Sequence, residues 1–360
     1  EIPFSNLSFY EDDDLIWGLN ITRFIQRKYE TVTWVPFPLD VEGVVSKYGH
    51  LYGLKGIYPP AKFEIRPYFM GGVSNYSDIR LKQIWEPWNH RLNYYKEPTN
   101  NLGIDIAYRI NPSSKLTLTI NPDFGQIESD PANINLTAFE TYFKEKRPFF
   151  LNNMDIFETP VEIFYSRRIG DNSTGIGMEI QNNVGRNDTL YNLITIPTKI
   201  NVAGKLTGKN RNGLSYGLLS ALVTESDSSK WKNYYDPDTI YYPYKYPKQY
   251  FISRVKQDLL SGNSFLGFMS TSSFADSNHT FSVDGMANLF DNKLFIDGQI
   301  IMDSDKKKGI YGSIAYYPPG YLSGWIDYYH YDKGIDINDL GYLWRDDYTQ
   351  TKLGLKFQTL

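Results

Sequence analysis

The sequence predicts an all-β fold, an antiparallel transmembrane β-barrel of the outer-membrane type with about 14 or more strands. Apolar and polar residues alternate in many runs of about 9–11 residues, the length that a tilted strand needs to cross a bilayer. Aromatic residues make up 16% of the chain, and pairs such as Tyr316–Tyr317 and Tyr328–Tyr329 stand at the ends of these runs. A soluble antiparallel barrel or sandwich shows the same alternation and is the alternative.

The composition excludes several kinds of site. The chain of 360 residues has no cysteine, which excludes disulfides and cysteine-ligated metals. Its net charge of -4 argues against a nucleic-acid partner. The mean hydropathy of -0.44 suits a barrel, because half of each strand faces a polar interior. The motifs of serine hydrolases, phosphate loops and zinc proteases are absent from the sequence, so we expect no catalytic residue, no metal site and no cofactor.

The first hundred residues divide into three parts. We expect residues 1–14 to be the tail of an upstream domain or a linker, and the barrel to occupy 15–360. Two β-rich runs, 15–24 and 31–37, are joined by a polar turn and predict a hairpin. Between 38 and 100 many prolines and glycines interrupt any strand, so this region is expected to be a plug or a long loop, with one short strand at 62–70.

From residue 102 onwards the alternation becomes regular. Ile104 and Ile106, for example, flank Asp105, and Arg109 follows in the polar register. Runs of this kind predict strands at 102–110, 116–120, 199–206, 281–289, 294–302, 310–316, 322–328 and 352–358. The last run looks like an unfinished strand, so we expect this barrel to be incomplete and to close with later strands.

A dense set of charges lies in the central stretch 121–151 and just after it. These residues are Asp123, Glu128, Asp130, Glu140, Lys144, Lys146, Arg147, Arg167 and Arg168. Unpaired burial of such groups costs several kcal/mol, so they must pair with one another or lie in water. A barrel lumen and a solvated loop both meet this condition. A glycosidase would use two carboxylates about 5–10 Å apart, but the neighbouring basic residues favour a salt-bridge network over catalysis.

A second unusual segment is the aromatic loop at 226–248. Its rings include Trp231, Tyr234, Tyr235, Tyr241, Tyr242 and Tyr244. The loop is too long for a bare hairpin turn, so it is either functional or a packed lid. Stacking of these rings on a glycan is the functional interpretation. Packing of the loop by its own rings is the simpler interpretation, and we favour it.

The central run is also the basis of a family resemblance. NPDFGQIESDPANINLTAFETYFKEKRPFFL at 121–151, followed by FYSRRIG at 164–170, resembles the signature of an uncharacterised family of Gram-negative outer-membrane β-barrels. In that family the barrel follows an N-terminal carbohydrate-binding domain of the family-9 type, and EIPFSNLSF at 1–9 resembles the last strand of that domain. The resemblance covers nearly the whole chain. It implies a location in the cell outer membrane, among lipid and lipopolysaccharide, and no settled activity.

The resemblance implies an outer-membrane channel or surface receptor that handles glycans or oligosaccharides. In this hypothesis residues 121–170 fold into the lumen, and Arg167 and Arg168 determine the electrostatics of a constriction. One alternative is a plugged barrel that anchors its upstream domain, a surface lipoprotein or another subunit of a complex. Another is a membrane-bound glycan hydrolase that uses Asp123 or Glu128, although the balance of these observations is against an enzyme.

Overall fold

The computed structural model describes most of the chain. The residues outside the description are 1–8, 10–13, 37–47, 59–60, 78–93, 123–136, 138, 171–172, 181–189, 197, 211, 226–230, 233–239, 242–247, 275–276, 291–292, 319–321 and 358–360. No helix among the described residues is both long and apolar enough to cross a bilayer.

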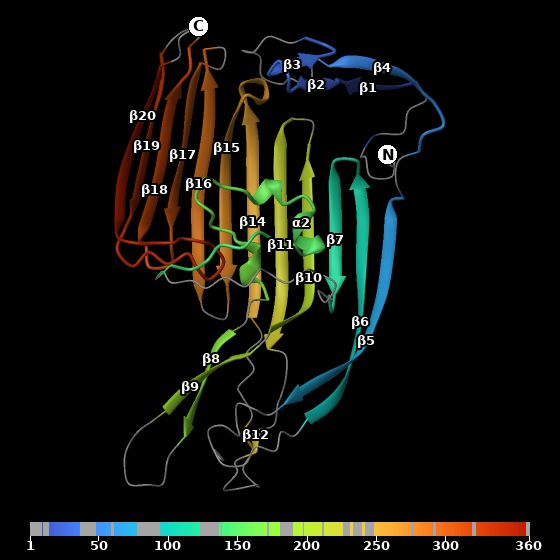
Figure 1. The fold of residues 1–360 in the computed structure, drawn as a ribbon, viewed down its shortest axis with the longest axis vertical. Helices are drawn as coiled ribbons and strands as arrows, with labels where there is room; N and C mark the ends of the chain where they lie inside the picture. Colours follow the sequence, from blue (N-terminus) through green and yellow to red (C-terminus); the bar gives the residue numbers. More distant parts are fainter. Residues whose placement is uncertain are drawn as a thin grey trace.

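One antiparallel sheet of twelve strands forms the wall of the molecule (Figure 1). Its strands are β5 (Phe63–Ser77), β6 (Tyr94–Asn111), β7 (Ser114–Ile120), β10 (Thr198–Lys209), β11 (Leu214–Glu225), β14 (Lys248–Leu259), β15 (Ser264–Ser273), β16 (Asn278–Leu289), β17 (Leu294–Met302), β18 (Lys308–Tyr316), β19 (Leu322–Tyr331) and β20 (Tyr348–Phe357). Each strand pairs with the next strand of the sheet along the chain, so the topology is an up-and-down meander. β5 and β20 are the two edges and do not pair with each other in the described part, so the sheet is open.

Among the described residues, four small two-stranded sheets lie outside the wall. They are β1 (Leu15–Leu19) with β4 (Gly49–Leu54), β2 (Thr22–Ile25) with β3 (Glu30–Thr33), β8 (Ser173–Ile180) with β9 (Leu190–Ile196), and β12 (Trp231–Lys232) with β13 (Ile240–Tyr241). β2 and β3 form the hairpin expected within residues 15–37. β1 instead pairs with the more distant β4, a pairing that the local pattern does not predict.

The two faces of the wall differ sharply in chemistry. On the outer face large apolar side chains are exposed: Phe63, Ile65, Leu116, Leu218, Phe251, Val255, Leu266, Phe268, Phe281, Val283, Ile296, Ile300, Ile310, Ile314, Leu322, Ile326, Leu353, Leu355 and Phe357. On the inner face polar side chains are buried: Thr119, Lys205, Thr207, Ser215, Arg254, Thr271, Thr280, Ser282, Asp284 and Gln299. Successive side chains of a strand point to opposite faces, so the alternation in sequence becomes this separation in space.

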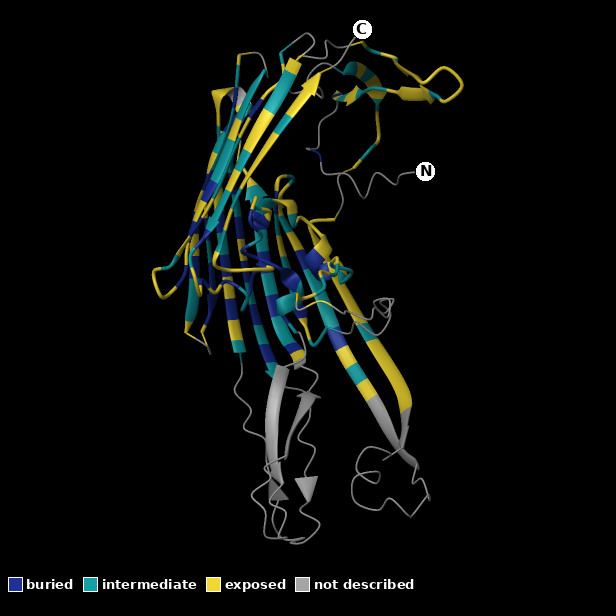
Figure 2. Ribbon diagram, turned by 60° about the vertical axis from the view of Figure 1, so that its left-hand side comes forward, coloured by how far each residue is buried: buried dark blue, intermediate teal, exposed yellow. Residues whose placement is uncertain are grey.

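The inner face is covered by a folded-in segment, residues 139–170, here called the inner segment (Figure 1). It contains three short helices, α2 (Pro148–Leu151), η3 (Asp155–Phe157) and η4 (Ser166–Arg168). Its apolar side chains form one cluster with the wall and with residues 335–343 of the β19–β20 loop. Phe150, Ile163 and Ile169 are almost completely buried there, and each such side chain stabilises the contact by about 1.5–3 kcal/mol. Figure 2 shows that buried residues concentrate in the middle of the wall, whereas β5 is largely exposed.

The strands expected from alternation all occur in the wall, whereas the region 38–100 differs from its expected role. β5 and residues 94–100 of β6 fall in that region, and β5 pairs with β6 over fifteen positions, from Phe63 with Tyr108 to Ser77 with Tyr94. Pro67 is tolerated because β5 is an edge strand, where one row of N–H groups needs no partner in the sheet. Of the described strands in this region, β5 and the start of β6 belong to the wall, whereas β4 pairs with β1 outside it. The cover on the inner face comes from residues 139–170 and 335–343.

Candidate functional site

The inner segment is fastened to the wall by side chains that the strands direct inwards. Gln299 of β17 is 2% exposed. The N–H of Val161 donates to its Oε1 at 2.6 Å, and its Nε2 donates to the Val161 carbonyl at 3.2 Å. Asn153 Nδ2 also donates to Thr207 Oγ1 of β10, at 3.2 Å. These bonds join residues far apart in sequence, so they give the segment a defined position on the wall.

Lys205 of β10 is a buried cation facing the same segment. Its side chain is buried, and its Nζ donates to the carbonyl of Phe149 at 2.6 Å and to that of Asn152. The last carbonyls of a helix have no partner within that helix. The ammonium therefore caps the short helix α2, and the carbonyls in turn satisfy an ammonium that would be costly to bury alone.

Glu145 and Arg147 form a staple inside the inner segment. Arg147 Nη2 lies 2.7 Å from Glu145 Oε2, and both side chains are nearly buried. Arg147 also donates to the carbonyls of Ser166 and Ile169, and Ser166 Oγ donates to Glu145 at 2.6 Å. Burial alone would raise the pKa of the Glu145 carboxyl, but the hydrogen bonds and charge of Arg147 outweigh it and hold that pKa below its usual value. The staple thus ties residues 145–147 to residues 166–169.

Arg167 and Arg168 have different surroundings. Arg168 forms two hydrogen bonds with the carboxylate of Glu140, at 2.8 and 2.6 Å, and its Nε donates to the Gly341 carbonyl at 3.1 Å. Arg167 donates to the carbonyl of Lys144. Arg167 therefore binds within the inner segment, whereas Arg168 links the inner segment to the β19–β20 loop.

A group of tyrosines joins the inner segment to the same loop. The rings of Tyr142 and Tyr165 stack at 4.9 Å between centroids, and Tyr342 packs edge-on against both. Tyr142 OH donates to Glu162 at 3.1 Å. Burial, and then the neighbouring Glu162, raise the pKa of Tyr142 to about 12, and burial raises the pKa of Glu162 as well. Tyr142 therefore remains a neutral hydrogen-bond donor at ordinary pH.

A buried ion pair lies in the wall itself. Arg254 of β14 reaches across Gly267 to Asp284 of β16, and both side chains are 1% exposed. Two hydrogen bonds connect the guanidinium to the carboxylate. A side chain at position 267 would collide with the guanidinium, since an added Cβ would lie 2.6 Å from Arg254 Nη1.

The structure places only some of the residues that the sequence singled out. Glu140, Lys144, Lys146, Arg147, Arg167 and Arg168 all lie in the inner segment. Asp123, Glu128 and Asp130 lie outside the described residues, as do Tyr234, Tyr235, Tyr242 and Tyr244 of the aromatic loop. Trp231 and Tyr241 occupy paired backbone positions of strands β12 and β13, where only the backbone is described.

Sequence reasoning missed Glu145, Lys205, Arg254, Asp284 and Gln299. A detectable signal existed for Lys205 and Asp284, because each is a charged residue in the polar register of an alternating run. Their partners could not be found in this way, since Lys205 binds backbone carbonyls that are more than fifty residues away in the chain.

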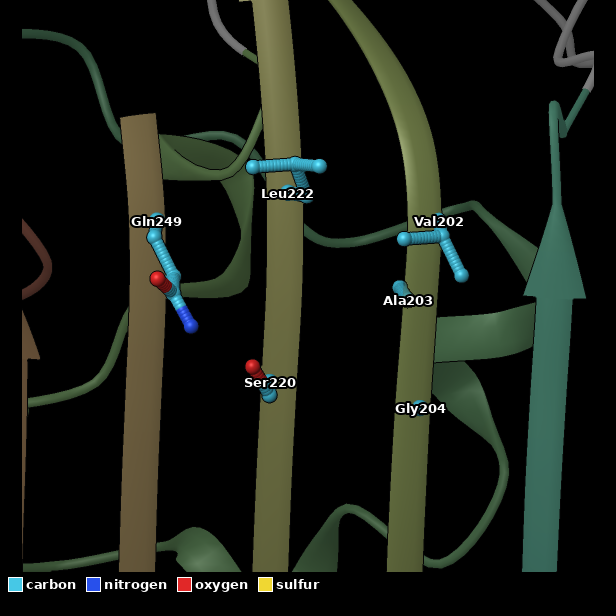
Figure 3. A pocket seen from close by; sticks show the side chains of 6 residues that line it. All are labelled: Val202, Ala203, Gly204, Ser220, Leu222 and Gln249. Atoms are coloured by element: carbon cyan, nitrogen blue, oxygen red, sulfur yellow. The ribbon is translucent and has the colours of Figure 1, made fainter. Parts of the chain in front are cut away.

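Neither a metal cluster nor an enclosed catalytic pocket emerges from the described ranges. Within them no three His, Asp or Glu residues converge as metal ligands. Figure 3 shows a hollow on the outer face, lined by Val202, Ala203, Gly204, Ser220, Leu222 and Gln249. None of its lining residues is titratable, so it offers no acid–base chemistry.

The ion pair of Glu140 with Arg168 should contribute little to stability. Glu140 is about half exposed, and pairs in that setting are typically worth about 0–1 kcal/mol because water competes for both groups. We expect Glu140→Gln to lower the free energy of unfolding by less than about 1 kcal/mol, measured by urea unfolding of the detergent-folded protein. A loss of several kcal/mol would show that this pair is a main attachment of the inner segment.

Comparison with solved structures finds outer-membrane proteins. "Salmonella typhi OmpF complex with Daunomycin" has 9% identity and a TM-score of 0.32, over 82% of this chain and 97% of that chain. OmpT of Vibrio cholerae, an outer membrane protein in its trimer form, has 10% identity and a TM-score of 0.27, over 82% of this chain and 98% of that chain. These similarities are too low to carry an argument about function.

No curated protein matches the chain. A family model does match, over residues 59–360, which is most of the chain and includes all twelve strands of the wall, the inner segment and the β19–β20 loop. The chain belongs to the family described as "Domain of unknown function (DUF5916)".

Proposed function

We propose that this protein is an integral β-barrel of a Gram-negative outer membrane whose interior is narrowed by the inner segment. The observation that carries the proposal is the inverted polarity of the wall. Its outer face exposes large apolar side chains on strands at both edges and throughout the middle, and its inner face buries charges and hydroxyls.

The energetics favour lipid as the surrounding of the outer face. Leu353, Leu355 and Phe357 of β20 are each more than 70% exposed. Apolar surface in water costs roughly 25 cal/mol per Å² relative to burial, and soluble monomers rarely expose a continuous apolar surface of this extent. All nine described wall strands from β10 onwards have 9–12 residues, close to the length that a tilted strand needs to span a bilayer.

A bilayer also requires that the sheet close. An unpaired strand edge in hydrocarbon leaves backbone groups without partners, at several kcal/mol each. The edges of β5 and β20 must therefore pair, directly or through further strands, in the membrane-embedded protein. The twelve strands described here then form all or part of a barrel wall, with the inner face towards the lumen.

The inner segment distinguishes a narrowed barrel from an open diffusion pore. It occupies the inner face with a continuous apolar cluster and is bonded to wall residues Gln299, Thr207 and Lys205. Displacing it would expose that cluster and leave Lys205 without its acceptors. We therefore propose a gated or receptor-type barrel, in preference to a permanently open channel.

The proposal is tested by insertion and conductance of the full-length protein. It should float with liposomes after a urea wash, and in planar bilayers it should show only small or rare conductance steps. The double variant Lys205→Ala/Gln299→Ala, which removes wall contacts to the inner segment, should give larger or more frequent steps.

Gln249→Ala is the matched control, because Gln249 is a wall glutamine in the hollow of Figure 3, on the outer face. It should behave like the unaltered protein. Failure to float with liposomes would refute the membrane assignment. Large, constant steps from the unaltered protein would refute the narrowed interior while leaving the barrel assignment intact.

A further inference from the structure

We infer that the inner face of β17–β20 carries a binding surface for a neutral oligosaccharide, formed by Trp325, Tyr329, Asp297, Asp327 and Lys352. The inference rests on the proposed function, because it takes this face of the sheet to line the barrel lumen. It differs from the aromatic loop at 226–248, and none of its residues belongs to the charged set of the central stretch.

These residues lie on the inner face of the wall, the same face that the inner segment covers in another part of the sheet. Tyr331 of β19 is 5% exposed within the apolar cluster. β19 pairs with β18 without a register shift, so Tyr329, Asp327 and Trp325 follow Tyr331 on the same face. Each step of two residues is about 6.8 Å. The rings of Trp325 and Tyr329 therefore stand about two such steps apart, with the carboxylate of Asp327 between them.

Trp325 is held flat against the wall. Its register partner on β20 is Gly354, and a Cβ added to that glycine would lie 2.0 Å from Trp325 Cζ2. The absence of a side chain at 354 thus lets the indole lie over the neighbouring strand. The residue is still 38% exposed. The wall packs against one face of the indole and holds the ring in place. The exposed part of the ring therefore forms a rigid apolar surface.

Tyr329 forms a second platform with its neighbours. Its ring centroid lies 5.1 Å from that of Tyr311 on β18. Lys352 Nζ of β20 lies 4.9 Å from the centre of the Tyr329 ring. Tyr311 OH is directed towards the carboxylate of Asp297, at 3.3 Å. The aromatic rings of Tyr311 and Tyr329 therefore lie beside the charged groups of Asp297 and Lys352.

A polar belt crosses the wall between the two platforms. In register order it runs from Asp297 on β17 through Ser313 on β18 and Asp327 on β19 to Lys352 on β20. Ser313 Oγ donates to Asp327 at 2.7 Å. The carboxylates have further acceptor capacity, and the ammonium of Lys352 can donate three hydrogen bonds.

This combination fits a chain of neutral sugar rings. The C–H face of a pyranose is apolar and flat enough to cover an aromatic ring, and its hydroxyls both donate to carboxylates and accept from an ammonium. Hydrogen bonds with charged partners are stronger than neutral ones, which adds specificity. Two carboxylates against one lysine disfavour an acidic saccharide, so a neutral one is the better match.

Binding of maltohexaose and cellohexaose to the full-length protein in detergent micelles tests this inference. At least one of these neutral hexasaccharides should bind, measured by calorimetry and by quenching of tryptophan fluorescence. Trp325→Ala and Asp327→Asn should each weaken that binding by about tenfold or more. The first removes the aromatic ring on which a sugar stacks, and the second removes the charge of the hydrogen-bond acceptor. Trp325→Phe keeps a ring over Gly354 and should fold normally, with an intermediate loss of affinity.

The control is Tyr328→Leu, on the same strand and the outer face, where Tyr328 is 40% exposed. Its affinity should equal that of the unaltered protein. The inference would be overturned if neither hexasaccharide binds, or if Trp325→Phe, Asp327→Asn and Tyr328→Leu all bind with equal affinity. Flotation of the same samples with liposomes separates the two proposals, because a protein that inserts without binding sugar contradicts only this one.

Discussion

Replacing Asp284 with Ala should lower the free energy of unfolding by about 3–5 kcal/mol, because it leaves the guanidinium of Arg254 buried without its counter-charge. Both side chains are 1% exposed, so water cannot take the place of the lost carboxylate. The measurement is urea unfolding of the protein folded in detergent micelles, followed by tryptophan fluorescence.

The double variant Arg254→Met/Asp284→Leu should recover much of this loss, since replacing a whole buried pair by apolar side chains is often close to neutral. Ser282→Ala is the matched control. Ser282 lies two residues before Asp284 on the same face, and its buried Oγ has no hydrogen-bond partner in the described structure. It should change stability by less than about 1 kcal/mol. A similar loss in Asp284→Ala and Ser282→Ala would mean that the ion pair is not the origin of the effect.

Replacing Arg147 with Met should release the inner segment while leaving the wall folded. The change leaves Glu145 buried with an unbalanced charge and removes the donors to Ser166 and Ile169. Breaking a buried pair from one side costs about 3–5 kcal/mol. Because the chain has no cysteine, a single Val161→Cys substitution reports on release. Val161 lies in the inner segment, where it is 6% exposed against the wall, so a cysteine there should react with a maleimide faster in the Arg147→Met background.

The same staple predicts an acid-sensitive segment. The pKa of Glu145 is lowered in the folded protein from its usual value of 4.5. A depressed carboxyl pKa contributes stability that is fully present above pH 4.5 and is lost as the pH falls through the lower folded pKa. Labelling of the introduced cysteine by 4,4′-dithiodipyridine, a disulfide reagent that reacts with thiols in acid, should therefore accelerate below that value, relative to labelling of a free cysteine at the same pH.

Arg167→Met is the control for Arg147→Met, since Arg167 is a neighbouring arginine whose hydrogen bonds to the Lys144 carbonyl are exposed. It should leave the labelling rate near that of the unaltered background. Equal labelling rates in the Arg147→Met and unaltered backgrounds, at neutral and acid pH alike, would show that the staple does not hold the inner segment in place.

The strands of the wall were largely predictable because their signal is local. The runs that contain Ile104, Val283, Ile300 and Leu355 alternate in sequence, and each lies in a strand of the wall. A period of two specifies both the strand and its two faces, without reference to any other part of the chain. Pairing between consecutive strands then follows, because neighbouring antiparallel strands need only short connections.

The candidate site was less predictable because its bonds are long-range. The charges of residues 140–168 were visible in the sequence, but the pairing of Arg147 with Glu145 and of Arg168 with Glu140 depends on how the segment folds back on itself. In the same way, the row formed by Trp325, Asp327 and Lys352 spans two strands and becomes a surface only through their register.

The amino-acid sequence alone thus determined the β architecture, the alternation of apolar and polar faces and the absence of disulfides, since each is a property of composition or of short-range periodicity. Only the tertiary structure decided that residues 139–170 cover the inner face, that Lys205 caps α2, and that Gly354 makes room for the ring of Trp325. These contacts join positions that no local pattern relates, because they form only when the twelve strands have placed their inward side chains on one surface.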